Sequence, residues 1–209
     1  MQLFSRTLTL NGSPRQVMPW ATEITNHINS HSSIGVSCWS SLFGYPVGTL
    51  IWSARIESQA AFMAATADLV ADGAYNDLIE QAASFSGAPA EDALRDVVYG
   101  TSAGTLPLGA VAMLTTGVAA LDRMADAVAW SVDIAQHAER VGGNPVFVAI
   151  DVYGQMGRIA WLGTTADIAA ADDVGAKLNA DSAYLGRLAE TKGLFIPGSG
   201  HRAQAVKIA

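Results

Sequence analysis

The chain is short of basic charge, of cysteine and of long apolar runs, and each shortage excludes a class of protein. Of its 209 residues, 12 are Lys or Arg and 19 are Asp or Glu, which gives a formal net charge of -7 at pH 7. Binding to DNA or RNA depends on clustered Lys and Arg that neutralise phosphates, so nucleic acid is not an expected partner. The single cysteine, Cys38, can form neither an intrachain disulfide nor a multi-thiolate metal site, and it is compatible with a reducing compartment.

No stretch of the sequence has the pattern of a membrane span or a secretory signal. The longest apolar runs, at 108–114 and 146–150, are far shorter than the roughly 20 residues that a spanning helix needs. The start of the chain mixes Ser, Arg and Thr with apolar residues, whereas a signal peptide has a basic start followed by an apolar core. We therefore expect a soluble, cytoplasmic protein with no membrane partner.

The common motifs of nucleophilic and nucleotide-dependent catalysis are also missing. The sequence contains no G-x-S-x-G elbow, no G-x-x-x-x-G-K loop and no strand-linked G-x-G-x-x-G. Gly198-Ser199-Gly200 is typical of a flexible turn, and Cys38 has no neighbouring base that the sequence reveals. We predict no cofactor, and the sequence assigns no catalytic residue.

The strongest positive signal is an internal repeat. When the chain is shifted by 109 positions, residues 48–75 align with residues 157–184 without a gap. The most informative identical pairs are Gly48 with Gly157, Trp52 with Trp161, Leu69 with Leu178, Asp72 with Asp181 and Tyr75 with Tyr184. An alanine-rich composition does not explain the Trp, Tyr and Asp pairs, so we predict two copies of one unit.

Each half shows the same order of strand-like and helix-like segments. The predicted strands are 4–10, 34–43, 49–56 and 94–99 in the first half, and 111–116, 146–153, 158–164 and 203–208 in the second. The predicted helices are 14–29, 58–85 with a break near Asp72-Gly73, 121–140 and 167–191. Ser13-Pro14 is expected to cap and open the first helix, and Ser58 and Asp167 are expected N-caps. The Gly- and Ser-rich segment 100–107 serves as the linker, so the predicted units are 1–105 and 106–209.

This β-α-β-β-α-β order is the ferredoxin-like pattern, and it predicts an α+β fold. The antiparallel sheet of such a unit has helices on one face only, which leaves its other face bare. Two units in one chain can cover these bare faces by laying them together. We therefore predict one pseudo-twofold antiparallel α+β barrel with its helices outside.

Several segments resemble a known family, the dimeric α+β barrel superfamily. They are Gly48 to Trp52, Glu57-Ser58 and Ala71 to Tyr75, echoed at Gly157 to Trp161 and Ala180 to Tyr184. The superfamily includes proteins similar to the antibiotic-biosynthesis monooxygenases (ABM-like), NIPSNAP-like proteins and stress-responsive barrels. Members are usually homodimers of one unit, so the fused pair that the repeat predicts departs from the common pattern, although fused versions are familiar in the superfamily. Their activities include oxygenation, isomerisation, cyclisation and haem chemistry, so the resemblance does not imply one reaction.

Trp52 and Trp161 are candidate ligand-binding residues, although their orientation stays open at this stage. Residues of a strand point alternately to the two faces of the sheet, and one of these faces looks into the barrel. If the two indoles point inward, they form an aromatic lining suited to a flat apolar ligand. If they point outward, they are core residues beneath the helices.

Arg6 and Arg55 are further candidates, because each stands in a strand that is otherwise apolar or hydroxylic. A guanidinium inside a cavity needs a carboxylate or an anionic ligand, whereas one at a strand end can reach solvent, and both interpretations stay open. The corresponding positions of the second half hold Thr115 and Thr164, so a cavity would have one chemically distinct end. Ser53 shares a face with Arg55 and completes the candidate set.

The four histidines do not predict a metal site. His27 and His31 have the H-x-x-x-H spacing that places two imidazoles on one helix face, but two ligands are too few for zinc and the sequence shows no third. His137 and His201 could be proposed as axial haem ligands, although nothing in the sequence marks either of them.

These observations favour a barrel that binds or transforms a small, mostly apolar molecule, as a cofactor-independent oxygenase, isomerase or cyclase. This hypothesis predicts a cavity larger than about 300 Å³ between the sheets. The alternative is a non-catalytic stress-related or interaction protein, and a haem enzyme is a third possibility. Pairing of the fused barrel into a homodimer stays open.

Overall fold

The structure is a computed structural model, and it describes residues 1–100 and 104–209. A short 3-10 turn, η1 (Leu121–Arg123), precedes α4. In these ranges the main elements follow one another in the order β1 (Gln2–Thr9), α1 (Pro14–His31), β2 (Val36–Phe43), β3 (Thr49–Ile56), α2 (Gln59–Ala71), α3 (Gly73–Ala83), β4 (Glu91–Tyr99), β5 (Val111–Val118), α4 (Met124–Gly142), β6 (Val146–Asp151), β7 (Arg158–Thr165), α5 (Ile168–Ala180), α6 (Ser182–Ala189) and β8 (His201–Lys207).

The strands form a closed antiparallel barrel in the order β1-β3-β2-β8-β5-β7-β6-β4. Strands β1 to β4 are therefore contiguous, as are β5 to β8, and the two sets meet at β2·β8 and β4·β6. The register of pairing shifts at both of these junctions. Closure leaves no unpaired sheet edge that could join another chain. The prediction of an α+β antiparallel barrel is confirmed.

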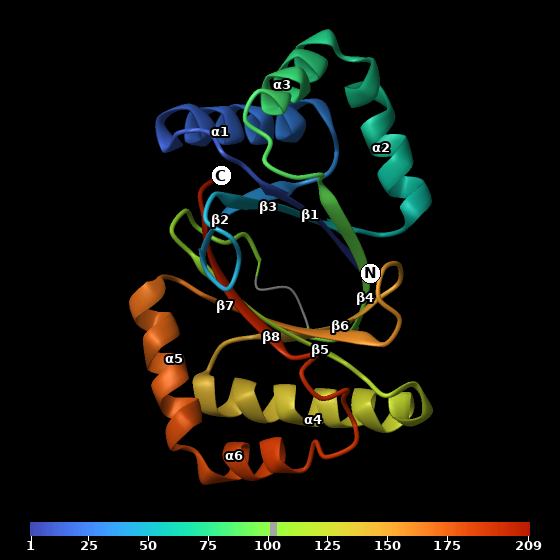
Figure 1. Cartoon of the computed structure of the whole chain (residues 1–209), viewed down its shortest axis with the longest axis vertical. Coiled ribbons are helices and arrows are strands. Elements are labelled where there is room, and N and C mark those ends of the chain that lie inside the picture. Colours follow the sequence, from blue (N-terminus) through green and yellow to red (C-terminus); the bar gives the residue numbers. More distant parts are fainter. Residues whose placement is uncertain (101–103) are drawn as a thin grey trace.

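The helices form two outer layers on opposite sides of the barrel. Helices α1, α2 and α3 lie outside β1 to β3, and α4, α5 and α6 lie outside the strands of the second set (Figure 1). This arrangement matches the expectation that the helices lie outside. It also means that each strand has one face toward a helix layer and one toward the barrel interior.

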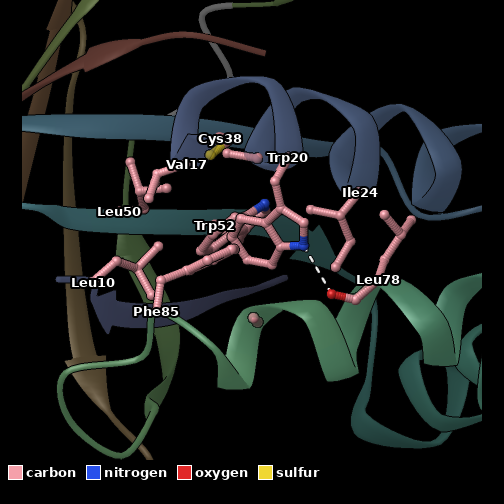
Figure 2. Close-up of a cluster of buried hydrophobic side chains, with 11 residues drawn as sticks. Leu10, Val17, Trp20, Ile24, Cys38, Leu50, Trp52, Leu78 and Phe85 are labelled. Carbon is pink, nitrogen blue, oxygen red and sulfur yellow. Dashed lines mark hydrogen bonds between the residues drawn. The ribbon is translucent and has the colours of Figure 1, made fainter. Parts of the chain in front are cut away.

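The apolar core lies between the barrel wall and the helices, and tryptophans are prominent in it. In the first half, Trp20 of α1 meets Trp52 of β3 edge to face, with ring centroids 5.7 Å apart, and also contacts Phe85 (Figure 2). The Trp20 indole N–H donates to the carbonyl of Leu78 at 2.8 Å, so its polar atom is satisfied despite burial. In the second half, Trp130 and Trp161 meet in the same way at 5.9 Å.

The break predicted near Asp72-Gly73 is confirmed. Asp72 ends α2 and begins α3, because its carboxylate accepts the backbone N–H of Ala74 at 2.8 Å. Asp181 has the same place between α5 and α6, where it accepts the N–H of Tyr184 at 2.6 Å. An aspartate at an N-cap satisfies donors that have no partner within the helix, so the sequence itself starts the new helix.

The expected N-caps are confirmed at two helices and wrong in detail at a third. The side chains of Ser58 and Asp167 accept N–H groups from α2 and α5 at 3.1 and 2.8 Å. Ser13 does occupy the N-cap position of α1, but its hydroxyl donates to the Gln16 side chain and caps no backbone group. Pro14 opens α1 as predicted, because its fixed φ suits the first turn and it has no N–H to satisfy.

Some boundaries differ from the predicted ones. Strands β4 and β8 begin at Glu91 and His201, earlier than expected, because pairing with β1 and β5 extends beyond the apolar residues. The predicted linker at 100–107 includes residues 101–103, which lie outside the described residues. In the rest of the chain, every helix is too short or too polar to cross a membrane.

Candidate ligand-binding site

The interior of the barrel contains a cavity of about 950 Å³. This volume exceeds the roughly 300 Å³ expected from the sequence and is within the range of small-molecule sites. Its lining residues come from all the strands of the barrel and from the loops at both ends. The cavity exists because many inward positions carry small side chains, among them Ser5, Ser53, Ala112, Ala203 and Ala205, which do not meet across the barrel.

The lining of the cavity combines apolar side chains with hydroxyl, amide and charged groups. Leu114, Phe147 and Leu162 line one wall, on β5, β6 and β7. On the other wall, Trp39 of β2 lies beside Ser53 of β3, and its indole N–H donates to the serine hydroxyl at 2.9 Å. Apolar surface together with fixed polar groups is typical of a pocket for a small organic molecule.

A group of charged residues lies in the barrel where β4 and β6 run side by side. Arg95 Nε is 2.8 Å from Asp151 Oδ1, and the two side chains are only 11% and 1% exposed. Arg95 also donates to Ser5 Oγ at 3.1 Å, and Arg158 Nη1 lies 3.4 Å from the second oxygen of Asp151. One carboxylate therefore faces two guanidinium groups.

The hydrogen bonding of this charged group is incomplete. The Nε–H of Arg95 does not point at Asp151 Oδ1 well enough for a hydrogen bond, so both atoms are buried without one in the described part of the chain. Buried polar atoms are nearly always hydrogen-bonded to protein or to ordered water. The attraction between the two charges is therefore the main interaction that these atoms make.

Tyr45 and His201 stand at the end of the barrel where β2 turns into β3. Their rings are 5.6 Å apart, and His201 Nε2 lies 2.7 Å from the carbonyl oxygen of Gly44. Both line the cavity, and burial raises the pKa of the Tyr45 hydroxyl. Gly44 has φ of +85° and could not carry a side chain without striking the Arg202 carbonyl, so the sharp turn that places Tyr45 here requires glycine.

Two of the candidate residues, Ser53 and Arg55, do line the cavity. The Arg55 guanidinium lies over the ring of Phe147 at 5.3 Å, so it reaches from β3 across to β6. Burial lowers the pKa of Arg55. Their role in ligand binding stays a prediction.

The structure places Trp52 and Trp161 outside the cavity, which corrects their candidacy as lining residues. Both indoles point toward the helices, where Trp52 donates to the Thr25 hydroxyl at 2.9 Å and Trp161 donates to the Ser131 carbonyl at 3.1 Å. The second of the two orientations left open by the sequence is therefore the observed one. Strand parity alternates strictly, so Ser53 can face the cavity only if Trp52 faces the helices.

Arg6 is also placed away from the interior. It makes a two-pronged hydrogen bond to Asp92 at 2.8 Å for each contact, and the two side chains are 44% and 47% exposed. This interaction with Asp92 raises the pKa of Arg6. Of the two interpretations of this arginine, the structure favours the solvent-facing one.

The histidines considered as haem ligands are occupied elsewhere. His137 is buried in the outer helical layer, where its Nε2 lies 2.9 Å from Asp181. His201 contacts Gly44 through the same atom at the rim of the cavity. Neither arrangement presents an unengaged Nε2 to the middle of the cavity.

Sequence reasoning missed the residues that give the cavity its charge and its aromatic surface. Trp39, Phe147 and Asp151 gave no signal, because each fits an ordinary strand pattern. Arg95 could have been found, because it interrupts an apolar strand as Arg55 does. The inward position of Arg158 depends on the pairing of β7 with β5 and β6, which the sequence does not give.

Solved structures share this fold. A proposed monooxygenase from Fusobacterium nucleatum subsp. nucleatum is 11% identical, with a TM-score of 0.76 over 100% of this chain and 92% of its own. A proposed monooxygenase from Lactobacillus acidophilus is 11% identical, with a TM-score of 0.69 over 100% and 94%. An anthrone oxidase-like protein is 10% identical, with a TM-score of 0.64 over 98% and 91%. At such low identity these likenesses show the fold alone. No protein-family model matches the chain, and no curated protein sequence matches it.

Proposed function

We propose that this barrel binds a small, mostly apolar molecule in its central cavity. The observation that carries the proposal is the cavity itself, about 950 Å³ inside the barrel. A barrel that binds no ligand in its interior would be filled by its own side chains, as small barrels usually are. The names of the similar structures, which include proposed monooxygenases and an anthrone oxidase-like protein, agree with a site for small molecules.

The ligand that fits best has an apolar body and an acidic group. Leu114, Phe147 and Leu162 on one wall, and Trp39 on the other, would contact the body of the ligand. The cations that line the cavity are Arg55, Arg95, Arg158 and Lys207, and its lining carboxylates are Glu91 and Asp92. A third carboxylate, Asp151, contacts Arg95 and Arg158. In a chain of net charge -7, this local excess of positive charge favours an anion.

A pair of fluorescent probes tests the site and its charge preference together. We expect 8-anilino-1-naphthalenesulfonate, which is aromatic and anionic, to bind the native protein with a stoichiometry of one. The neutral analogue N-phenyl-1-naphthylamine should bind more weakly, by about tenfold or more, which corresponds to about 1.4 kcal/mol. Equal affinities would refute the anion preference, and no binding of either probe would refute the site.

Variants that fill the cavity provide the matched control. Leu114 and Leu162 both line the cavity and are only half-buried there, so Leu114→Trp and Leu162→Trp should extend into empty space. Each should weaken the sulfonate probe without unfolding the protein. Leu188→Trp, in helix α6 and 40% exposed, should leave probe binding unchanged. If all three variants behave alike, the probe binds outside the barrel.

As reaction types, we propose a cofactor-independent oxygenase, isomerase or cyclase. The oxygenase is the most direct to test, because an oxygen electrode can follow O₂ consumption when an anthrone is added. Consumption that stops in the cavity-filling variants would support this chemistry. A protein that binds the anthrone and consumes no O₂ is not such an oxygenase.

We also propose that the chain is a fused pair of ferredoxin-like units, residues 1–105 and 106–209. Matching contacts support this. Trp20 donates to the carbonyl of Leu78, and Trp130 donates to the carbonyl of Arg187, 109 positions after Leu78. A split of the gene between the two units, followed by co-expression, should give a complex with the spectrum of the whole protein, and two insoluble halves would argue against it.

A non-catalytic interaction protein remains the second candidate, and exposed apolar side chains favour it. Val47, Tyr153 and Met156 are exposed in the β2–β3 and β6–β7 hairpins, and the alternation of strand directions puts both hairpins at the same end of the barrel. Light scattering tests the homodimer of the fused barrel that this candidate suggests. A monomer at every concentration would remove self-association as its function.

A further inference from the structure

Three side chains meet in the outer helical layer of the first half, away from the cavity. His27 and His31 come from the last turns of α1, and Asp72 from the break between α2 and α3. Their potential ligand atoms all lie within 4.8 Å of one another. Within residues 1–100 and 104–209 this is the one group of three or more His, Cys, Asp or Glu with that geometry. The sequence showed two of these residues, and the fold supplies the third.

The two imidazoles are already close together, and rotation of a ring about its side-chain bonds would turn both nitrogen lone pairs toward one ion. Residues four apart share one face of a helix, and here the rings of His27 and His31 are stacked at 4.1 Å with an angle of 14° between them. His31 Nδ1 lies 3.0 Å from the carbonyl oxygen of His27, so its proton can stay on Nδ1 and its Nε2 is left as a lone-pair donor. Such a backbone contact is how metal-binding histidines are commonly oriented.

The carboxylate is held in place as well. Asp72 Oδ1 accepts the N–H of Ala74 at 2.8 Å, and Oδ2 faces His27 Nε2 at 2.8 Å. Oδ2 is therefore the oxygen nearest to the imidazoles, and an ion bound between it and His27 Nε2 would replace the proton of their hydrogen bond. His27 and Asp72 are 15% and 24% exposed, so the group is reachable from solvent.

The second half contains a similar contact between a histidine of the long helix and the aspartate of the helix break, but it has no second imidazole. His137 Nε2 lies 2.9 Å from Asp181, and the neighbouring cation there is Arg140, with Nη1 3.3 Å from His137 Nδ1. The His–Asp contact by itself is therefore explained as a link between the long helix and the helix break. It does not explain why the first half adds His31, an exposed histidine stacked on His27.

We propose that His27, His31 and Asp72 bind a divalent transition-metal ion. Two imidazole nitrogens and one carboxylate oxygen form the donor set of many zinc sites with three protein ligands, and the fourth position would be open to water. Because the ligands come from α1 and from the α2–α3 break, the ion would join these elements. Its effect would be on the stability of the helical layer and not on the chemistry of the cavity.

The test uses the full chain without a polyhistidine tag, freed of metal by a chelator and titrated with ZnCl₂. We expect one zinc per chain by equilibrium dialysis. We also expect a rise in Tm of roughly 5–10 °C when free zinc is about one hundred times the Kd. Co²⁺ in place of zinc should give visible absorption typical of a four-coordinate site.

Variants at His31 separate metal binding from folding, because His31 is exposed while His27 is half-buried. His31→Ala and His31→Arg should weaken zinc at least tenfold and abolish the rise in Tm, while the metal-free Tm stays close to that of the wild type. His201→Ala, which removes an exposed histidine elsewhere, should change neither the zinc affinity nor the zinc-dependent rise in Tm. No zinc bound by the wild type, or binding that survives in both His31 variants, would overturn the proposal.

Discussion

Replacement of Asp151 by Asn should destabilise the protein far more than the same change at an exposed ion pair. The Asp151 side chain is 1% exposed, and it faces both Arg95, which is 11% exposed, and Arg158. Asp151→Asn removes the negative charge and leaves Arg95 buried beside a second cation. Breaking a buried ion pair in this way costs about 3–5 kcal/mol, and because the cavity admits solvent we expect the lower end, about 3 kcal/mol.

The matched control is Asp92→Asn, at the exposed pair with Arg6. Both side chains of that pair are nearly half exposed, so its loss should cost only about 0–1 kcal/mol. Urea unfolding measures both variants. With a slope of about 2–3 kcal/mol per molar, Asp151→Asn should lower the midpoint by about 1–1.5 M, and Asp92→Asn by less than about 0.5 M.

A double variant separates the loss of an attraction from the exposure of a buried charge. Arg95→Met combined with Asp151→Leu removes both charges and keeps similar volume, so it should recover most of the lost stability. Equal midpoint shifts for Asp151→Asn and Asp92→Asn would refute the reasoning, because they would show that the interior pair is as well hydrated as the surface pair.

The packing between the barrel and the helices has three further testable consequences. Trp52→Phe and Trp161→Phe should each lower the free energy of unfolding by about 1–3 kcal/mol and leave probe binding unchanged, since both indoles pack under helices; altered probe affinity with unaltered stability would contradict this. Burial raises the pKa of Cys38 to about 12, so a thiol reagent at pH 8 should label it only as fast as the protein unfolds. Rapid labelling of the native protein would show that the Cys38 thiol is not buried. The hydrogen bond from His137 lowers the pKa of Asp181, so this carboxylate stabilises the fold above its unfolded pKa of about 4, and the contribution is lost as the pH falls through the lower folded value. Asp181→Asn should therefore flatten the loss of stability in acid, as measured by urea unfolding between about pH 2 and pH 5, and an unchanged acid slope would count against it.

The fold was predictable because the residues that set the order of helices and strands act on their neighbours in the chain and because their pattern occurs twice in the sequence. The shift of 109 positions matched Trp52 with Trp161 and Asp72 with Asp181, and from such matches the order of elements and the barrel could be inferred. The structure confirms the α+β antiparallel barrel with outer helices. The helix break at Asp72 was predictable for the same reason, because N-capping depends on neighbouring residues alone.

The site was less predictable because it depends on which strand face points inward. The alternation of side chains along β3 is visible in the sequence, but the sequence does not show which of the two faces points into the barrel. It therefore could not decide whether Trp52 or Ser53 lines the cavity. The contact of Arg95 with Asp151 joins β4 to β6 across 56 residues, and the carboxylate that meets His27 comes from Asp72, between α2 and α3. Such pairings are set by tertiary packing and by barrel closure, which no spacing in the chain encodes.

We propose that the cavity inside the barrel is a site for a small molecule with an acidic group. A crystal structure of the protein with bound 8-anilino-1-naphthalenesulfonate tests it most directly. We predict density for the probe inside the barrel, with its rings against Trp39 or Leu162 and its sulfonate toward Arg95 and Arg158 or toward Arg55. Density for the probe on the outer surface alone, with no probe inside the barrel, would contradict the account.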